Sequence, residues 1–522
     1  MTGPDLMYTV DINDGRLRGG PLPGGGALFA GIPFAAPPVG PLRLRPPQPP
    51  QPWSDVRDAT EFRPAPPQRL PALLAGTGSG AGSGEGDSAT TSMVEAVAGG
   101  AGAHDEDCLY LNVWTPELSG RRPVLVWIYG GGFDSGSAGL PSTDGAALSR
   151  LTGAVVVAAN YRVGALGFLH LAELGGPGWA GSSNLGLQDQ AMALRWVRDN
   201  IAAFGGDPGN ITVAGESAGA FSIGSLLAAP AAGGTFHRAI LSSGSTGRVF
   251  AADTGTAIAA DLLAKLGLDT VDELADVPVE RILDVQTSVI DTDIGRRNLP
   301  GGRSWGVVLD GTVLPRDPQA AVADGAAAGI GLLVGANRDE MRMFQAMQGA
   351  AYVPTDEPAL LAEMEQAGVT EPARLLAGYR QRSPEADLAT LRTLFLTDAV
   401  YRRPASALAA AQTAAGGSAH TYLFAAEPLG PDLGAFHGAD LVLVFDALER
   451  TGNATPELIK VRDDLAGAWA RFAATGDPGW APYDPDARQN TRQFGGAGEM
   501  VTEPPADEAA AAWATASEAV KP

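Results

Sequence analysis

The stretch Ile211-Thr-Val-Ala-Gly-Glu-Ser217-Ala-Gly219 decides the fold of this chain. Its first residues are β-branched and favour a strand, while the residues from Ala218 to Leu227 can continue as a helix. Between the two lies the pattern G-x-S-x-G, whose glycines permit a strained strand-to-helix turn. Such a turn would lift the Ser217 hydroxyl above the end of a sheet, where a base and a substrate can both reach it.

This pattern alone is weak evidence, because the chain has 69 glycines among 522 residues. Its surroundings carry more weight. Six apolar runs have the length of strands, namely Leu109–Trp114, Pro123–Tyr129, Ala154–Asn160, Ile211–Ala214, Ala239–Ser242 and Ile330–Gly335. Helical periods separate them, and the clearest one places on one face Leu187, Ala191, Leu194, Val197 and Ile201. The alternation predicts an α/β fold with a mostly parallel twisted sheet, helices on both faces, and functional residues at the carboxyl ends of the strands.

The whole chain, residues 1–522, is expected to form a single catalytic domain with insertions. Residues 8–18 predict a hairpin, and the prolines of residues 33–71 predict extended chain that covers the core without building it. Residues 76–103 are rich in glycine and serine and predict a flexible surface loop. Residues 255–425, roughly, contain helical insertions that would form the walls of a pocket.

The composition of the chain argues against several classes of function. The formal charge of −23 argues against binding to nucleic acid or anionic membranes and favours neutral or cationic substrates. Cys108 is the only cysteine, so neither an internal disulfide nor a cysteine-based metal cluster can form. We find no signal-peptide pattern and no apolar run of membrane-spanning length, which predicts a cytoplasmic location.

A second glycine motif lies upstream of the serine. The predicted strand over residues 124–129 ends in Gly130-Gly-Gly-Phe133. Attack on an ester creates an alkoxide, and preorganised backbone N–H groups stabilise that charge where it develops. We therefore assign the oxyanion hole to the amides of Gly131, Gly132 and Ala218.

These motifs, with several longer stretches, resemble the type-B carboxylesterase and cholinesterase family, including its bacterial para-nitrobenzyl-esterase-like members. The resemblance is carried by Glu106-Asp-Cys-Leu-Tyr-Leu-Asn-Val-Trp114, Trp127-Ile-Tyr-Gly-Gly-Gly-Phe133, Asn160-Tyr-Arg-Val-Gly164 and Phe204-Gly-Gly206. Matches extend in order from Gly31-Ile-Pro-Phe34 to His437-Gly438 and cover most of the chain. The resemblance implies an α/β-hydrolase fold and a carboxylesterase that needs no cofactor and no metal.

In that family the acid lies in a segment like Gly335-Ala-Asn-Arg-Asp-Glu340, and the base in one like Gly434-Ala-Phe-His-Gly438. The resemblance therefore implies a catalytic triad of Ser217, Glu340 and His437. Their order along the chain is also the general one for α/β-hydrolases. A histidine can accept the serine proton, and a carboxylate at its other nitrogen fixes the tautomer.

Competing assignments exist for two of these positions. Asp339 is adjacent to Glu340, although the family places its carboxylate at the second acidic position. The other candidates for the base are His104, His170, His237 and His420. The resemblance further implies that Glu216 and Ser243 support the triad from behind, and that the internal ion pairs are Arg43 with Glu106 and Arg162 with Asp189.

The chain departs from the family in three places. Tyr129 stands where many relatives have histidine, but the amide donors should persist. Cys108 has no partner cysteine, so the loop of residues 76–103 lacks a tether and could gate the pocket. No cluster of aromatic residues for a quaternary ammonium is evident, which predicts no preference for choline esters. Phe133, Met343 and Phe344 are candidate walls of the substrate pocket, and core packing explains Met343 and Phe344 equally well.

The sequence thus predicts hydrolysis of carboxylic esters to acid and alcohol through an acyl-enzyme intermediate. The substrate is expected to be a small-molecule ester and the protein a monomer or small homo-oligomer. A binding or adhesion protein on an esterase scaffold is the alternative outside enzymes. A lipase, thioesterase or carbamate hydrolase would share the same mechanism, and the sequence leaves the physiological ester open.

Overall fold

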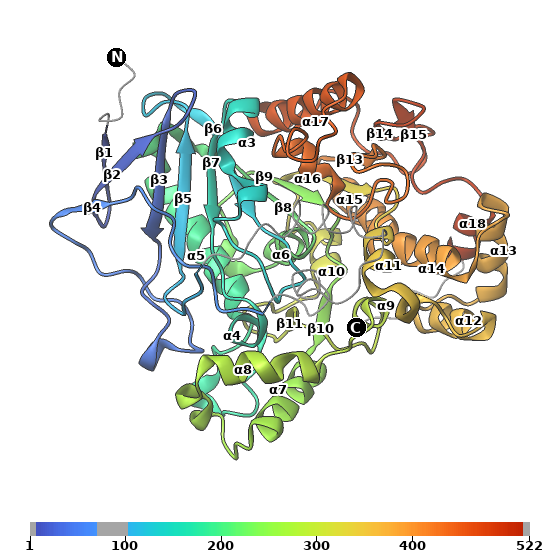
Figure 1. Ribbon diagram of the computed structural model, residues 1–522, viewed down its shortest axis with the longest axis horizontal. Coiled ribbons are helices and arrows are strands. Elements are labelled where there is room, and N and C mark those ends of the chain that lie inside the picture. The colour runs from blue at the N-terminus through green and yellow to red at the C-terminus, as the bar shows by residue number, and fades with distance from the viewer. Residues whose placement is uncertain (1–6, 70–102, 515–522) are drawn as a thin grey trace.

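The structure of this chain is a computed structural model that describes residues 7–69 and 103–514. The predicted loop of residues 76–103 therefore lies outside the described residues, apart from Ala103. A 13-stranded sheet forms the centre of the molecule, in the order β1-β2-β3-β5-β7-β6-β8-β9-β12-β13-β14-β15, with β4 paired to β2 (Figure 1). The strands are β1 Tyr8–Ile12, β2 Gly15–Pro21, β3 Ala27–Pro33, β4 Val56–Asp58, β5 Tyr110–Thr115, β6 Arg122–Ile128, β7 Val155–Ala159, β8 Gly206–Glu216, β9 Arg238–Ser242, β12 Gly331–Asn337, β13 Ala419–Phe424, β14 Thr491–Phe494 and β15 Met500–Val501.

The sheet is parallel at its centre and antiparallel at both edges. Every neighbouring pair from β7 through β6, β8, β9, β12 and β13 to β14 is parallel, whereas β2, β3 and β5 pair antiparallel on one side. The six predicted strands are confirmed as β5, β6, β7, β8, β9 and β12. The apolar runs read as strands because the central ones are buried on both faces, as β7 is along its whole length.

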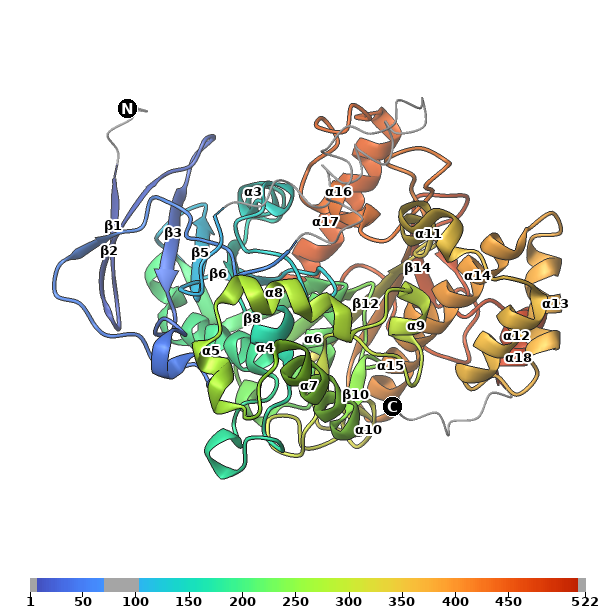
Figure 2. The same ribbon diagram turned by 60° about the horizontal axis from the view of Figure 1, so that its bottom comes forward.

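Helices cover both faces of the sheet. Figure 2 shows α3 and α17 on one side of the sheet and α5 and α6 on the other. The α-helices are α3 Gly145–Thr152, α4 Gly164–Phe168, α5 Leu185–Asn200, α6 Ala218–Leu226, α7 Ala252–Leu266, α8 Val279–Gln286, α9 Ile294–Asn298, α10 Pro318–Ala323, α11 Arg342–Gln348, α12 Glu357–Gln366, α13 Pro372–Arg382, α14 Leu388–Thr397, α15 Arg403–Ala414, α16 Ala439–Val444, α17 Pro456–Thr475 and α18 Glu508–Ala514.

Helix α5 shows how the sequence pattern produces the packing. All five residues of its predicted apolar face are buried, and the last of them, Ile201, directly follows the helix. Burying that face removes apolar surface from water, which contributes roughly 25 cal/mol for each Å². The helix therefore lies against the sheet and holds β7 and β8 from one side.

The N-terminal region agrees with the prediction in part. Strands β1 and β2 form the expected hairpin, with Tyr8 opposite Gly19 and Ile12 opposite Gly15. The proline-rich segment is mostly extended and supplies the edge strand β4. Proline has no backbone N–H to donate, so a segment rich in proline is better suited to the edge of a sheet than to its interior. The prediction that this segment does not build the core is wrong, because Phe34 and Leu44 are buried within it.

Of the helices in residues 255–425, α15 packs on β12 and β13, whereas others lie beyond the sheet together with the C-terminal helix α18. Helices α12, α13, α14 and α18 gather at the end of the molecule opposite β1 and β2 (Figure 1). A second, two-stranded sheet pairs β10 (Val249–Ala251) with β11 (Val307–Leu309) next to α7. Among the helices that the structure describes, none has the length and apolar character needed to cross a membrane.

Candidate active site

Ser217 occupies a sharp turn between β8 and α6. Its backbone has φ 53° and ψ −123°, a region that non-glycine residues rarely adopt, so the turn stores strain at the serine itself. The Ser217 amide donates to the Ser242 carbonyl over 3.0 Å, which fixes the turn to the neighbouring strand. The hydroxyl therefore stands at the carboxyl end of the sheet, as the sequence predicts.

The glycines around Ser217 are required by close packing. A Cβ atom on Gly219 would lie 2.0 Å from the Ile128 carbonyl oxygen, and one on Gly215 would lie 2.8 Å from the backbone of Gly219. A Cβ on Gly130 would come within 3.0 Å of the Ser217 Cβ. The sequence predicts that Gly215 and Gly219 permit a strained backbone, but neither has a positive φ. Glycine is needed at both positions because a side chain would collide with the neighbouring backbone.

His437 and Glu340 meet Ser217 at the carboxyl ends of strands of one parallel sheet. The Nε2 atom of His437 lies 2.8 Å from Ser217 Oγ, and its Nδ1 atom lies 2.6 Å from Glu340 Oε2. Glu340 follows β12 and His437 lies between β13 and α16, so parallel strands bring all three to one edge. Exposed fractions of 8%, 4% and 0% for the serine, histidine and glutamate keep most water away from the line of hydrogen bonds.

Several polar side chains that the sequence interpretation missed hold this line in place. Asn337 donates its backbone N–H to Glu340 Oε1 over 2.7 Å, and its side-chain amide donates to the Phe436 carbonyl over 2.7 Å. The same amide reaches Asp440, whose other oxygen accepts from the Ser242 hydroxyl. Burial raises the pKa of Asp440. Asn337 and Ser242 end strands β12 and β9, and Asp440 lies in α16, but nothing in the sequence pairs them.

The three amides predicted to form an oxyanion hole are available as donors. Gly131 and Gly132 have φ values of 109° and 65°, so the loop after β6 needs glycine at both positions. The Gly131 carbonyl accepts from the amides of Asp134 and Ser135 at 3.1 Å each, which closes the loop into a tight turn. Among the described residues, no protein atom accepts a hydrogen bond from the amides of Gly131, Gly132 or Ala218.

Tyr129 replaces the family's histidine with a reciprocal tyrosine pair. Its hydroxyl donates to the Tyr161 carbonyl over 2.7 Å and accepts from the Tyr161 amide, while the Tyr161 hydroxyl donates to the Tyr129 carbonyl over 2.8 Å. The two rings stack with centroids 4.2 Å apart. Because both ends of each tyrosine are bonded, the strand exit that leads into Gly130 is rigid.

Glu216 lies beside the same imidazole nitrogen that faces the serine. Its Oε1 atom is 3.2 Å from His437 Nε2, and neither this oxygen nor the buried Ser243 hydroxyl has a hydrogen-bond partner within residues 7–69 and 103–514. No hydrogen bond between Glu216 and Ser243 occurs among the described side chains. Burial raises the pKa of Glu216. Burial lowers the pKa of His437, but the adjacent Glu216 and Glu340 carboxylates raise it by more.

Aromatic side chains pack around the imidazole. The Phe344 ring centroid lies 5.2 Å from that of His437, and the Tyr401 ring lies 4.9 Å from it. Phe133 is fully buried and packs edge-on against Phe168, and Met343 is also buried. Phe344 thus contacts the triad, whereas the described contacts of Met343 place it in the core.

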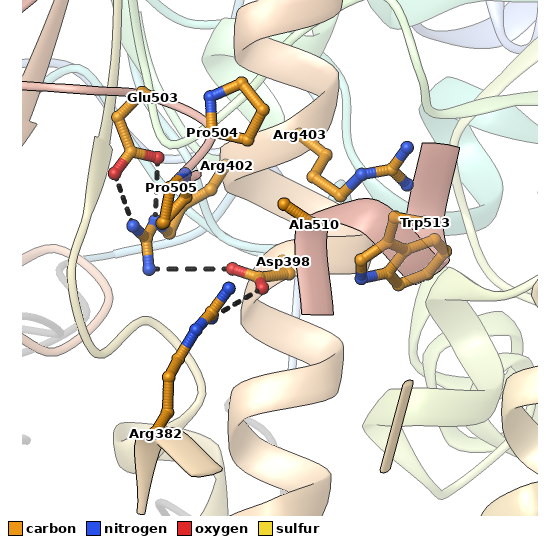
Figure 3. A pocket seen from close by; sticks show the side chains of 9 residues that line it. All are labelled: Arg382, Asp398, Arg402, Arg403, Glu503, Pro504, Pro505, Ala510 and Trp513. Atoms are coloured by element: carbon orange, nitrogen blue, oxygen red, sulfur yellow. Dashed lines mark hydrogen bonds and ion pairs between the residues drawn. The ribbon is translucent and has the colours of Figure 1, made fainter. Parts of the chain in front are cut away.

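Tyr401 was missed by the sequence interpretation and sits on a π-helical turn, η9 (Asp398–Arg402). Such turns occur often at functional sites. Figure 3 shows Arg382 and Arg402 converging on Asp398, with Glu503 on the far side of Arg402. These ion pairs tie the turn to α13 and the C-terminal segment.

The competing residues lie elsewhere. Asp339 accepts from Arg338 and from the Ala435 amide, and none of its hydrogen bonds in the described part of the chain involves an imidazole. The other histidines have other partners. His170 forms a hydrogen bond with Ser183, and His237 accepts one from the Ile211 amide. His104 is exposed, and His420 packs on Trp480.

Both ion pairs implied by the family resemblance are present. Arg43 Nε lies 2.7 Å from Glu106, and its Nη1 also donates to the carbonyls of Ala275 and Val277. Arg162 binds Asp189 through two nitrogens at 2.9 and 2.7 Å. The hydrogen bonds from Arg43 to the two carbonyls tie the N-terminal segment to the helical insertions.

Comparison with known proteins agrees with this geometry. The family model described as "Carboxylesterase family" matches residues 7–499. The chain belongs to the carboxylesterase family. It is 36% identical over 476 residues to the para-nitrobenzyl esterase of Bacillus subtilis (strain 168), an alignment that covers 88% of this chain and 90% of the relative. It is 32% identical over 498 residues to liver carboxylesterase 1F of Rattus norvegicus, which covers 88% and 84% of the two chains.

Solved structures of carboxylesterases are similar as well. The Geobacillus stearothermophilus carboxylesterase at pH 6.2 superposes with a TM-score of 0.82 at 35% identity, covering 97% of this chain and 99% of that one. This carboxylesterase therefore has the α/β-hydrolase fold, as predicted, and is a serine hydrolase that cleaves carboxylic esters to acid and alcohol. A Ser-His-Glu triad is characteristic of its family.

Proposed function

We propose that Ser217 is the nucleophile of ester hydrolysis, His437 the general base and acid, and Glu340 the carboxylate that orients the imidazole. The observation that carries this assignment is the continuous pair of hydrogen bonds from Ser217 Oγ through His437 to Glu340, at 2.8 and 2.6 Å. A base within hydrogen-bond reach of a hydroxyl can take its proton during attack. The Glu340 carboxylate stabilises the imidazolium that forms.

In the first step, the Ser217 oxygen attacks the ester carbonyl and its proton passes to His437 Nε2. The resulting alkoxide accepts hydrogen bonds from the free amides of Gly131, Gly132 and Ala218. Collapse of this intermediate breaks the bond to the alcohol oxygen, which takes the proton from His437. Water then attacks the acyl-enzyme, His437 removes its proton, and the acid leaves as the serine is restored.

The side chains near the imidazole support an apolar surface for a small-molecule ester. Phe344 and Tyr401 contact His437, and Phe133 follows directly on the oxyanion loop. We assign Phe344 and Phe133 to this surface, while Met343 packs in the core. Thioesters and carbamates would follow the same two steps. A cytoplasmic location, together with a monomer or small homo-oligomer, remains a prediction of the sequence.

Labelling with an organophosphate tests the nucleophile directly. Only a serine activated by a base reacts, so we expect the protein to gain one phosphoryl group, located on the peptide that contains Ser217. The measurement is the mass of the intact protein and of its peptides. Ser217→Ala should remain unlabelled under the same conditions, and labelling at any other residue would refute the assignment. A binding protein on the same scaffold would gain no label at all.

Glu216→Gln should shift the pH dependence of activity. The base must be neutral to act, so kcat/KM rises as the pH passes the pKa of His437. The nearby Glu216 carboxylate raises that pKa because it stabilises the imidazolium. Removing its charge should move the acidic limb of the kcat/KM profile to lower pH, and Glu117→Gln, at a surface position, should leave the limb in place. An unshifted limb in Glu216→Gln would mean that Glu216 does not act on the base.

A further inference from the structure

Arg248 lies between two aromatic residues that border the candidate active site. Its guanidinium carbon is 5.3 Å from the ring centroid of Phe133 and 5.8 Å from that of Phe221. Phe133 follows the oxyanion glycines, and Phe221 lies one turn beyond Ser217, to whose carbonyl it donates over 2.9 Å. The guanidinium therefore sits where the oxyanion loop and the nucleophile helix approach each other.

No carboxylate neutralises this arginine within the described part of the chain. Its Nη2 donates to Ser304 Oγ over 2.9 Å, and its Nε is buried without an acceptor. Burying a charged group is costly unless it is paired and hydrogen-bonded. Arg248 is partly buried, and four arginines of comparable or lower exposure do pair with carboxylates, namely Arg43, Arg162, Arg392 and Arg402.

The surroundings leave a net positive charge at this point. Within the described residues, Asp134 is the carboxylate that acts electrostatically on Arg248, and a second cation, Arg297, approaches the same carboxylate to 3.7 Å. The Tyr401 phenol stays neutral, because burial raises its pKa well above the usual value. Burial lowers the pKa of Arg248 only to about 10, which leaves the guanidinium charged at neutral pH. The overall charge of −23 therefore does not describe the field at the site.

We propose that Arg248 makes this carboxylesterase prefer esters that carry a carboxylate group, and that the guanidinium is the binding site for this group. The inference rests on the proposed function, because it places the carboxylate on the substrate of Ser217. A guanidinium presents a planar fork of donors that matches a carboxylate, and aromatic rings on its flanks limit competition from water. The net charge of the chain predicts neutral or cationic substrates, whereas the charge around Arg248 favours anionic ones.

Two pairs of esters of nearly equal shape test the preference. On the acyl side, para-nitrophenyl hydrogen glutarate is compared with para-nitrophenyl valerate. On the alcohol side, meta-(butyryloxy)benzoate is compared with meta-acetylphenyl butyrate. Since a hydrogen bond to a charged group contributes enough to change an equilibrium by about 10- to 100-fold, we expect kcat/KM to favour the carboxylate ester by about that factor in one pair. The pair that shows the preference identifies the side of the ester bond that faces Arg248.

Arg248→Gln should abolish the preference and leave kcat/KM for the neutral ester within about threefold of wild type, because the neutral ester makes no ionic contact to lose. Arg316→Gln changes the net charge equally at an exposed pair with Asp324 and should preserve the preference. If Arg248→Gln lowers both esters of a pair to the same extent, or if the wild type shows no preference in either pair, the proposal is wrong and Arg248 only fixes the packing of Phe133.

A measurement on the unaltered protein guards against misfolding of the variant. Glutarate should inhibit hydrolysis of para-nitrophenyl valerate competitively, and at concentrations at least about tenfold below those needed for neutral glutaramide. Equal inhibition by the two would contradict the proposal. Turnover of the neutral esters reports on the triad separately, so failure of the proposed function would appear as activity that survives Ser217→Ala, whatever Arg248 does.

Discussion

Replacing Ser217 with alanine should lower kcat/KM for a para-nitrophenyl butyrate substrate by roughly 10⁵- to 10⁶-fold, the range seen when the nucleophile of a serine hydrolase is removed. His437→Ala should cause a loss of similar size, because the hydroxyl at 2.8 Å would lose the group that takes its proton. The double variant should be no worse than either single one, since the two residues act as a unit. Initial rates at several substrate concentrations give the comparison.

Ser225→Ala is the matched control for this experiment. Ser225 is also a buried serine of α6, but its hydroxyl donates to the Phe221 carbonyl within the helix and contacts no part of the triad. Its kcat/KM should stay within about threefold of wild type. The melting temperatures of all variants should lie within about 4 °C of the parent, since such a shift corresponds to a change of about 1 kcal/mol or more in the free energy of unfolding. Substantial turnover by Ser217→Ala in a folded protein would remove the basis for the proposed function.

Glu340→Gln should lower kcat by about 10⁴-fold while KM changes little, as expected when the carboxylate of a triad becomes an amide. The glutamine keeps the size of the side chain, but it can present its NH₂ group to His437 Nδ1, which favours the wrong tautomer. Glu340 Oε1 also accepts from the Asn337 amide over 2.7 Å, so the carboxylate is held in one orientation. Steady-state kinetics at saturating ester measure the effect.

Asp339→Asn separates this role from a general loss of negative charge. Asp339 precedes Glu340 directly, yet its carboxylate binds Arg338 and the Ala435 amide. We expect its kcat to stay within about tenfold of wild type, with any loss arising from a looser loop around residue 435. A collapse of kcat in Asp339→Asn together with near-normal turnover by Glu340→Gln would exchange the two assignments.

The strands and helices that position the site were predictable from local patterns. Strands such as β7 are buried on both faces and appear in the sequence as apolar runs, and α5 has one apolar stripe along its length. Burial therefore leaves a pattern in the sequence from which these elements can be predicted. The serine turn was recognisable from G-x-S-x-G between a predicted strand and a predicted helix, whereas only the structure shows that close packing requires Gly215 and Gly219. The proline-rich segment was read less well, because extended chain can bury Phe34 without any periodic signal.

The sequence by itself determined the α/β fold, the serine turn and the glycine loop, because each depends on neighbours along the chain and on steric limits that hold in any context. The tertiary structure alone decided how the Tyr129–Tyr161 pair stiffens the loop, how Asn337 and Asp440 hold the acid and base, and that Arg248 forms no ion pair with any described carboxylate. Those contacts join residues that are far apart in sequence. Their energies depend on distance and burial, which only the folded chain defines.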